Sequence, residues 1–135
     1  METKKYPIIV EQFHFDMVDP KTDTNQNVQV AMRQVEPSDP ARKDELKSGN
    51  MFEIMVPFDV IPPQAGFRVS GKITRVVQTL DYFGQANEIS PDDLEKLSRP
   101  LIEYIETLTY QVTAVALDKG YQLEFEASGN QKDNQ

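Results

Sequence analysis

The most regular hydrophobic pattern in this chain lies between residues 99 and 120. Apolar side chains recur there at steps of four, three, four and three, which places them on one face of an α-helix; they are Leu101, Ile105, Leu108, Val112 and Val115. From Val112 onward almost no polar face remains, and a helix that is apolar all round is buried on more than one side. The pattern predicts a long helix that packs on a sheet through one stripe only.

The second apolar stripe of this helix predicts self-association. One sheet covers one face of a helix, so we expect the remaining apolar residues to meet another copy of the chain. The predicted oligomer interface consists of Ile105, Leu108, Val112, Val115 and Ala116, in a dimer or a tetramer.

Capping signals set the expected bounds of this helix. Ser90, followed by a proline and two aspartates, is typical of a helix start. We expect a short first helix that ends near Leu97. Ser98 then predicts a second start, with Pro100 in the first turn of the long helix, and Gly120 predicts its end.

Four segments before the helix alternate apolar and polar residues, as strands do when they bury one face. They are residues 8–18, 28–33, 51–61 and 67–82. The pattern predicts an α+β fold, in which a four-stranded antiparallel sheet packs on one long C-terminal helix. The connections allow a meander or a crossed order, and the first two strands could pair as a hairpin.

Local features modify this sheet. Pro57 cannot donate to a ladder, so its strand is expected at an edge or with a bulge. The parity of the apolar residues changes between positions 71 and 77, which predicts a bulge or bend there. The first seven residues are expected to be loose. Residues 36–50 are expected to form a surface loop with a helical turn at residues 41–46.

Domain organisation follows from where the apolar residues stop. Alternation resumes in residues 121–127 after the helix, whereas residues 128–135 contain no apolar side chain. We expect one domain over residues 1–127 and a disordered tail over residues 128–135.

Composition narrows the class of function. Hydrophobic residues make up 39% and charged residues 27% of the chain, and the net charge of −8 disfavours nucleic acid and anionic membranes as partners. The sequence contains no cysteine, which excludes disulfides, thiol nucleophiles and zinc–thiolate sites. No apolar run has the length of a signal sequence or a membrane span, so we expect a cytoplasmic protein without a cofactor.

No motif predicts an enzyme, since phosphate loops, nucleophile elbows and metal-ligand spacings are missing. The one histidine, His14, falls on the polar side of its strand with no group predicted to orient it for catalysis. Aromatic residues at the ends of elements have two interpretations: they close the edges of the core, or they form a groove for apolar peptide segments. The second interpretation predicts peptide binding by Tyr82, Phe83, Tyr121, Leu123 and Phe125.

The order of four strands, a polar turn region and one long helix resembles the SecB-like fold of bacterial protein-export chaperones. The likeness is carried by residues 99–104, which read RPLIEY, and by residues 118–123, which read DKGYQL. In SecB the helix likewise starts beside a proline and runs to a glycine and an extended Gln-Leu stretch. The likeness covers about residues 8–127, and the chain looks most like a family of small uncharacterised SecB-like proteins of Gram-positive bacteria.

The resemblance implies a function in binding other polypeptides. SecB-like subunits associate through the first strand and the long helix, bind unfolded polypeptide in apolar grooves, and deliver it to the export motor SecA. SecB has a second helix after the extended stretch, where this chain has the polar residues 128–135. Our first hypothesis is an ATP-independent, chaperone-like protein that holds unfolded client segments. The alternative is an oligomeric interaction or scaffold protein with one dedicated partner, and an enzyme is the third hypothesis.

Overall fold

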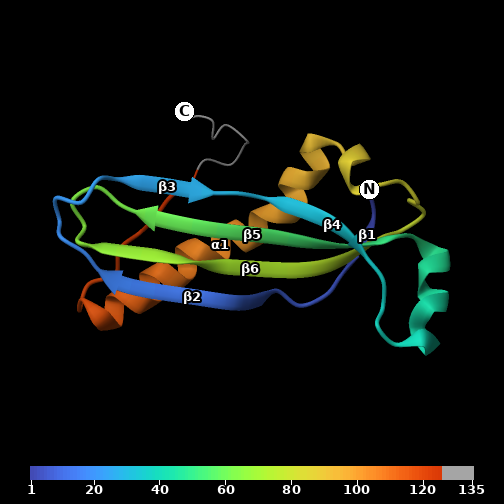
Figure 1. The fold of residues 1–135 in the computed structure, drawn as a ribbon, viewed down its shortest axis with the longest axis horizontal. Coiled ribbons are helices and arrows are strands. Elements are labelled where there is room, and N and C mark those ends of the chain that lie inside the picture. Colours follow the sequence, from blue (N-terminus) through green and yellow to red (C-terminus); the bar gives the residue numbers. More distant parts are fainter. Residues whose placement is uncertain (126–135) are drawn as a thin grey trace.

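The computed structural model describes residues 1–125, so the predicted tail over residues 128–135 lies outside the described residues. The described part forms six strands, two 3₁₀ helices (η1 and η2) and one α-helix (Figure 1). In chain order they are β1 (Thr3–Lys5), β2 (Ile9–Met17), β3 (Asn25–Val28), β4 (Ala31–Val35), η1 (Pro40–Ser48), β5 (Met51–Ile61), β6 (Phe67–Thr79), η2 (Ala86–Glu88) and α1 (Pro91–Ala116).

The sheet is antiparallel and centres on the pair β5 and β6, which stay in one register from Met51↔Gln78 to Val60↔Val69. β1 and β2 both pair with the outer side of β6, and β3 and β4 both pair with the outer side of β5. The sheet is therefore four strands wide, as predicted. It contains six strands because each edge of the sheet is formed by two short strands in line, β1 and β2 at one edge and β3 and β4 at the other. We call each of these pairs of strands in line a lane.

The strand order is crossed, and two predictions about the N-terminal part are wrong. β2 and the β3–β4 lane lie at opposite edges of the sheet, so they do not form a hairpin. The first residues are not loose either, because β1 pairs with residues 77–79 of β6. β6 extends beyond β2, and the N-terminal segment satisfies the backbone groups that would otherwise be unpaired there.

Pro57 lies in an interior strand rather than at an edge. Its carbonyl accepts a hydrogen bond from the N–H of Gln29 at 3.1 Å, so this side of Pro57 faces the β3–β4 lane. That lane is interrupted between Val28 and Ala31, opposite the place where proline has no N–H to donate. The sheet accommodates the proline by a break in the neighbouring lane.

The bulge that was predicted in β6 occurs in β2 instead. The pairing of β2 with β6 shifts between Val10 and Gln12, while β6 itself has no register shift against β5. The apolar residues of β6 change parity for a different reason. The C-terminal half of β6 is covered on both faces of the sheet. On one face Val77 lies in the core, and on the other face the η1 segment covers Gln78, which donates to the carbonyls of Glu45 and Gly49.

One face of the sheet carries the hydrophobic core. Alternate residues of the two central strands point towards α1, namely Phe52, Ile54, Val56, Phe58 and Val60 of β5 and Phe67, Val69, Ile73 and Val77 of β6. α1 crosses this face diagonally, from the β4 side at its start to the β2 side at its end (Figure 1). It contributes Leu97, Leu101 and Ile105 to the same core.

α1 is a single helix, which corrects the predicted split near Leu97. Ser90 caps it by accepting a hydrogen bond from the N–H of Asp93 at 3.2 Å, and Pro100 lies inside it. Ser98 is buried and donates to the carbonyl of Glu95, so it caps nothing. The helix ends at Ala116, four residues before the predicted Gly120. The left-handed residue is Asp118 (φ 58°), whose short polar side chain tolerates this conformation.

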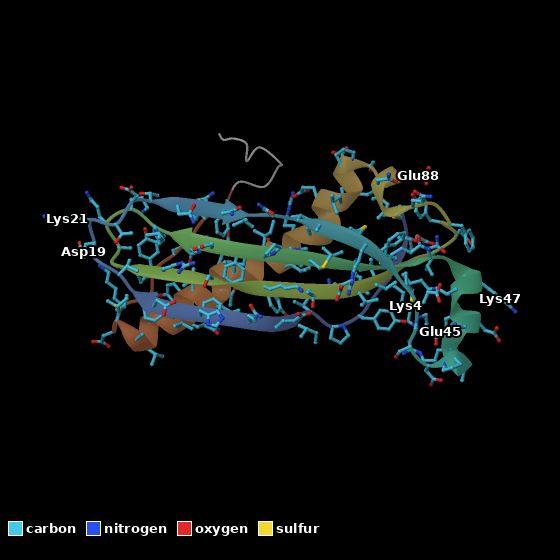
Figure 2. The ribbon with its side chains drawn as sticks, viewed as in Figure 1. Lys4, Asp19, Lys21, Glu45, Lys47 and Glu88 are labelled. Carbon is cyan, nitrogen blue, oxygen red and sulfur yellow. The ribbon has the colours of Figure 1, made fainter. Side chains whose placement is uncertain are left out.

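The opposite face of the sheet is polar and held by ion pairs. Arg68 and Asp59 form two hydrogen bonds, at 2.8 and 2.6 Å, and Lys72 pairs with Glu11 at 3.6 Å. Charged side chains also gather at both ends of the molecule (Figure 2), with Asp19 and Lys21 at one end and Lys4, Glu45, Lys47 and Glu88 at the other. The predicted helical turn at residues 41–46 forms part of η1 at this second end.

Gly71 allows β2 to lie close to β6. It pairs with Phe13 on one side and Phe58 on the other, and these two rings lie 6.0 Å apart above it. A Cβ atom at this position would overlap the carbonyl oxygen of Gln12 and lie 3.0 Å from the Phe58 ring. Only glycine leaves room for both neighbours.

We expect Gly71→Ala to lower the free energy of unfolding by about 1–3 kcal/mol, as overpacking in a closed site does. The measurement is urea denaturation, with Ser70→Ala as the matched control, because Ser70 lies beside Gly71 on the polar face. Equal midpoints for the two variants would show that β2 can move aside without strain.

The Asp59–Arg68 pair predicts a pH dependence of stability. Hydrogen bonds from the Arg68 guanidinium, together with its charge, hold the pKa of Asp59 below its ordinary value. A lowered pKa stabilises the fold above the unfolded-state pKa, and this contribution is lost as the pH falls through the folded-state pKa. Asp59→Asn should therefore be destabilising above about pH 5 and approach the wild type towards about pH 2. Urea denaturation across this range measures the difference, and a constant difference would contradict the expectation.

Candidate functional site

The residues of α1 that are buried and the residues of α1 that are apolar lie on the same side of the helix in its first half and on different sides in its second half. The fully buried residues advance by steps of four, from Leu101 and Ile105 to Thr109 and Thr113. Each step of four turns the stripe by about 40° around a helix of 3.6 residues per turn. The apolar residues advance by alternating steps of three and four, so beyond Ile105 they turn away from the sheet. The second half of α1 consequently buries threonines and exposes aliphatic side chains.

The five residues predicted at an oligomer interface therefore lie in different environments. Ile105 is fully buried in the core of its own chain and offers no surface to a partner. Leu108 and Val112 are half-buried, and Ala116 is exposed. Val115 is 86% exposed, the largest value among the exposed large hydrophobic residues of the described chain. Four of the five thus present part or all of their side chains to solvent.

The two buried threonines are polar groups in an apolar layer. The Thr113 hydroxyl donates to the carbonyl of Thr109 at 2.7 Å and accepts the N–H of Tyr121 at 2.8 Å. The Thr109 hydroxyl has no hydrogen-bond partner within the described part of the chain. A buried hydroxyl without a partner costs about 1–3 kcal/mol. The second half of α1 therefore places polar hydroxyls in the core while aliphatic side chains of the same half face solvent.

Strand β2 adds to this exposed surface. Val10 pairs with Ile73 of β6. Phe13, Phe15 and Met17 lie on the same face of the sheet, which is the face that α1 covers. Val10 is 37% and Met17 64% exposed, although both lie on this face (Figure 1). We name the combined surface the β2–α1 strip; it consists of Val10, Phe13, Phe15 and Met17 together with Leu108, Val112, Val115 and Ala116.

The backbone of β2 is also open to a partner. β2 pairs with β6 along one side, and the topology of the described strands places no strand on its other side. Every second residue of such an edge strand directs its N–H and C=O outward. The strip thus combines unpaired backbone groups with adjacent apolar side chains.

The residues predicted to bind peptide do not meet in one groove. Tyr82 and Phe83 follow the C-terminal end of β6, whereas Tyr121 packs edge-on against Phe67 at the other end of that strand, with ring centroids 5.2 Å apart. A strand of this length spans about 40 Å. Tyr82 packs on Phe52, and desolvation followed by the nearby Glu88 carboxylate raises its pKa above the ordinary value. Phe83 is 58% exposed, so Tyr82 and Phe83 lie in different environments although they are adjacent in the sequence.

Leu123 and Phe125 belong to an extended segment that returns along α1. We name residues 117–125 the C-terminal strap. Leu123 is buried, and Tyr121 and Phe125 are half-buried against the core. The alternation of residues 121–127 allowed an extended segment or a strand; the described residues of the strap form no strand, and its backbone is tied to α1 through side chains. The N–H of Tyr121 donates to Thr113, and the N–H of Phe125 donates to Glu106 at 3.0 Å.

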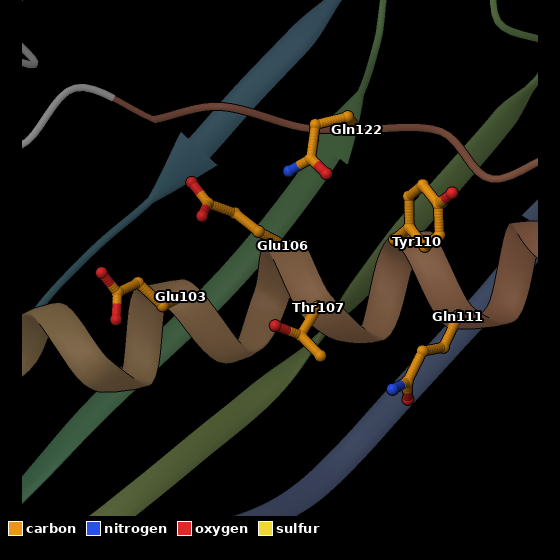
Figure 3. A pocket seen from close by; sticks show the side chains of 6 residues that line it. All are labelled: Glu103, Glu106, Thr107, Tyr110, Gln111 and Gln122. Atoms are coloured by element: carbon orange, nitrogen blue, oxygen red, sulfur yellow. The ribbon is translucent and has the colours of Figure 1, made fainter.

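An open cleft of about 420 Å³ lies between the strap and the outer side of α1. Its lining is polar and consists of Glu103, Glu106, Thr107, Tyr110, Gln111 and Gln122. Figure 3 shows Glu103, Glu106 and Gln122 on one side of α1 and Gln111 on the other, towards β2.

The described residues contain no cluster of histidine, cysteine and acidic side chains suited to a metal ion. His14 is exposed on the polar face of the sheet, paired in register with Ser70. None of the helices within residues 1–125 is long and apolar enough to cross a membrane.

Sequence reasoning missed the exposed part of β2 and the cleft. The alternation over residues 8–18 predicted a strand with one buried face, whereas Val10 and Met17 on that face are exposed. Glu11 interrupts the alternation and was the available signal for a bulge. The cleft has no comparable signal, because Gln122 reaches Glu103 and Glu106 only through the path of the strap.

Comparisons with known proteins show which sequences and structures this chain is similar to. No similar sequence was found among curated proteins. A protein of unknown function from Streptococcus agalactiae has a similar structure, with a TM-score of 0.76 and 26% identity over 93% of this chain and 98% of that chain. A SecB-like chaperone of Mycobacterium tuberculosis, solved in complex with a peptide from an antitoxin, matches with a TM-score of 0.48 and 13% identity over 92% of this chain and 90% of that chain. A likeness of that size supports no argument about function.

The family model for a protein of unknown function, DUF1149, matches residues 1–125, which is the whole described part of the sequence. This chain therefore belongs to the DUF1149 family.

Proposed function

We propose that this chain is a non-catalytic polypeptide-binding protein that works as a homo-oligomer. The observation that supports this most directly is the second half of α1, where Thr109 and Thr113 are buried while Val115 is 86% exposed. The exposure of Val115 contributes nothing to the stability of a single chain, since buried apolar surface stabilises by roughly 25 cal/mol per Å² and exposed apolar surface does not. A second chain that covers Val115 would recover the energy.

The β2–α1 strip is the surface that we assign to self-association. Pairing of β2 with β2 of a second copy would extend the sheet by its backbone groups, as strand addition does at an exposed edge. It would also bring the two exposed helix flanks together, because the C-terminal end of α1 crosses β2 (Figure 1). An interface of this kind is isologous, with the same patch on both copies.

Client binding is the second part of the proposal. Apolar side chains outside the strip remain exposed, among them Phe83 and Ile9, while the net charge of −8 keeps such a surface soluble. Unfolded segments would be held without ATP by burial of apolar surface, less the cost of ordering the client. An oligomeric scaffold with one dedicated partner would use the same strip for self-association. The client experiment below separates client holding from the scaffold function.

Self-association predicts the effect of a charge at the centre of the strip. We expect the wild type to be a dimer or tetramer by light scattering, and Val115→Asp to raise the dissociation constant by at least about a hundredfold, because the new carboxylate would be buried without a partner. Monomer stability should be unchanged, since Val115 is exposed in the single chain.

The matched control is Thr107→Asp, an exposed position of α1 that lines the cleft and lies outside the β2–α1 strip. This variant should assemble like the wild type. A Val115→Asp protein that is folded and has the wild-type mass would contradict the assignment of the strip.

Client holding predicts that the wild-type oligomer slows the aggregation of an unfolded protein without ATP. Reduced α-lactalbumin is a suitable client because it is acidic like this chain, so that charge attraction does not drive binding. Light scattering should show slower aggregation and a complex of larger mass. An oligomer that leaves aggregation unchanged in molar excess would exclude client holding and favour the scaffold with one dedicated partner.

A further inference from the structure

The C-terminal strap has the pattern that an extended ligand would need to fill an apolar groove. Tyr121, Leu123 and Phe125 alternate inward onto the core, whereas Gln122 and Glu124 are exposed between them. Leu123 is 7% exposed, and the Tyr121 ring packs edge-on against Phe67 of β6. The groove between α1 and the sheet thus accepts an extended segment with apolar side chains at every second position.

The backbone of the strap is held in a way that does not depend on its own sequence. Within residues 1–125 its extended part, residues 121–125, is tied to α1 by two N–H donors, at Tyr121 and Phe125, and both acceptors are side chains of α1. Any residue except proline supplies the same N–H group. Thr113 and Glu106 therefore offer two acceptors, spaced for positions i and i+4 of an extended chain, to whatever segment lies in the groove.

The strap is attached by a sharp turn, and its fit at that point is tight. Asp118 has a φ of 58°, and a Cβ atom on Gly120 would overlap the ring of Tyr110. Beyond Gly120 the strap has no strand pairing. A rotation near Asp118 that released the strap would break two hydrogen bonds of its backbone and expose the side chains of Tyr121, Leu123 and Phe125.

The outward positions of the strap face negative charge. Gln122 lines the cleft together with Glu103 and Glu106, and Figure 3 shows these three side chains on the same side of α1. The strap places a neutral amide here and another carboxylate, Glu124, two residues later. A lysine at the position of Gln122 would gain an attraction that the chain's own segment lacks.

We propose that the groove between α1 and the sheet is a binding site for extended polypeptide with apolar residues at alternate positions and a basic residue between them, and that the strap occupies it in cis as a competing ligand. This inference rests on the polypeptide-binding function proposed above and specifies its site and its preferred sequence. A tethered competitor has a high effective concentration, so an external segment binds well only when the strap is weakened or its own fit is better.

The test uses fluorescently labelled nine-residue peptides with the strap sequence LDKGYQLEF, with lysine in place of the glutamine, and with the three apolar residues shuffled into adjacent positions. Anisotropy measures their binding to the wild-type chain and to Leu123→Ser, whose strap loses its buried side chain. We expect Leu123→Ser to bind the strap peptide roughly tenfold more tightly, because an empty groove removes the competitor. The lysine peptide should bind more tightly than the strap peptide to both proteins, and the shuffled peptide more weakly.

Glu124→Ser is the matched control, since it places serine at the neighbouring exposed position and leaves the buried contacts in place. It should not show the gain in affinity of Leu123→Ser. Equal affinities of the strap peptide for the wild type, Leu123→Ser and Glu124→Ser would overturn the proposal, as would equal binding of the shuffled peptide.

A second measurement needs no variant and remains decisive if Leu123→Ser does not fold. Hydrogen exchange at the amides of Tyr121 and Phe125 should speed up when the wild-type chain is saturated with the lysine peptide, because displacement exposes both N–H groups. Peptide binding with these amides still protected would contradict the proposal while the polypeptide-binding function stands. The two proposals can also fail separately in the other direction. If peptide displaces the strap but the protein does not slow client aggregation, the groove remains a peptide-binding site and client holding is refuted.

Discussion

One helix has to cover a sheet face that is wider than the helix. Four strand lanes about 4.8 Å apart present an apolar face roughly 15–20 Å wide, whereas a helix with its side chains is about 10 Å across. α1 meets this constraint by crossing the face diagonally, so it covers β5 and β6 along its length and reaches β2 only at its end (Figure 1). Both regions beside the helix then need another cover, and the rest of the structure follows from how each one is treated.

On one side of α1 the chain covers the gap itself. The strap places Leu123 and Tyr121 on the core, and the Thr113 hydroxyl joins helix and strap by accepting the N–H of Tyr121. The same hydroxyl donates to the carbonyl of Thr109, so a buried polar group becomes the point of attachment for the covering segment. The helix, the strap and the sheet form one packed unit through this threonine.

On the other side of α1 the gap stays open. Val10 and Met17 of β2 and Val115 of α1 remain exposed beside a strand edge that has no partner in the described part of the chain. The two sides are separate surfaces, since Val115 and Glu106 lie on opposite flanks of the helix. The proposed self-association through the strip and the proposed peptide binding in place of the strap would therefore use different surfaces of one subunit.

Much of the architecture could be predicted from local patterns. Alternation over residues 51–61 fixes the side of β5 that is buried, and the spacing from Leu101 to Ile105 identifies the helix face that meets the sheet. These predictions succeed because the period of side-chain direction is a property of each element alone. The predicted pairing of the first two strands and the split of the helix failed, because strand partners and the tolerance of Pro100 depend on distant contacts.

The sequence by itself determined an α+β chain with a long helix that has more apolar surface than one sheet can cover. Only the tertiary structure decided where that surface lies. The diagonal crossing turns the buried stripe by about 40° with each step of four residues, so Ile105 goes into the core and Val115 to the surface. The path of the strap likewise decides that Tyr121 and Leu123 cover the chain's own core. Neither outcome can be derived from a spacing, because both depend on the angle at which the helix meets the sheet.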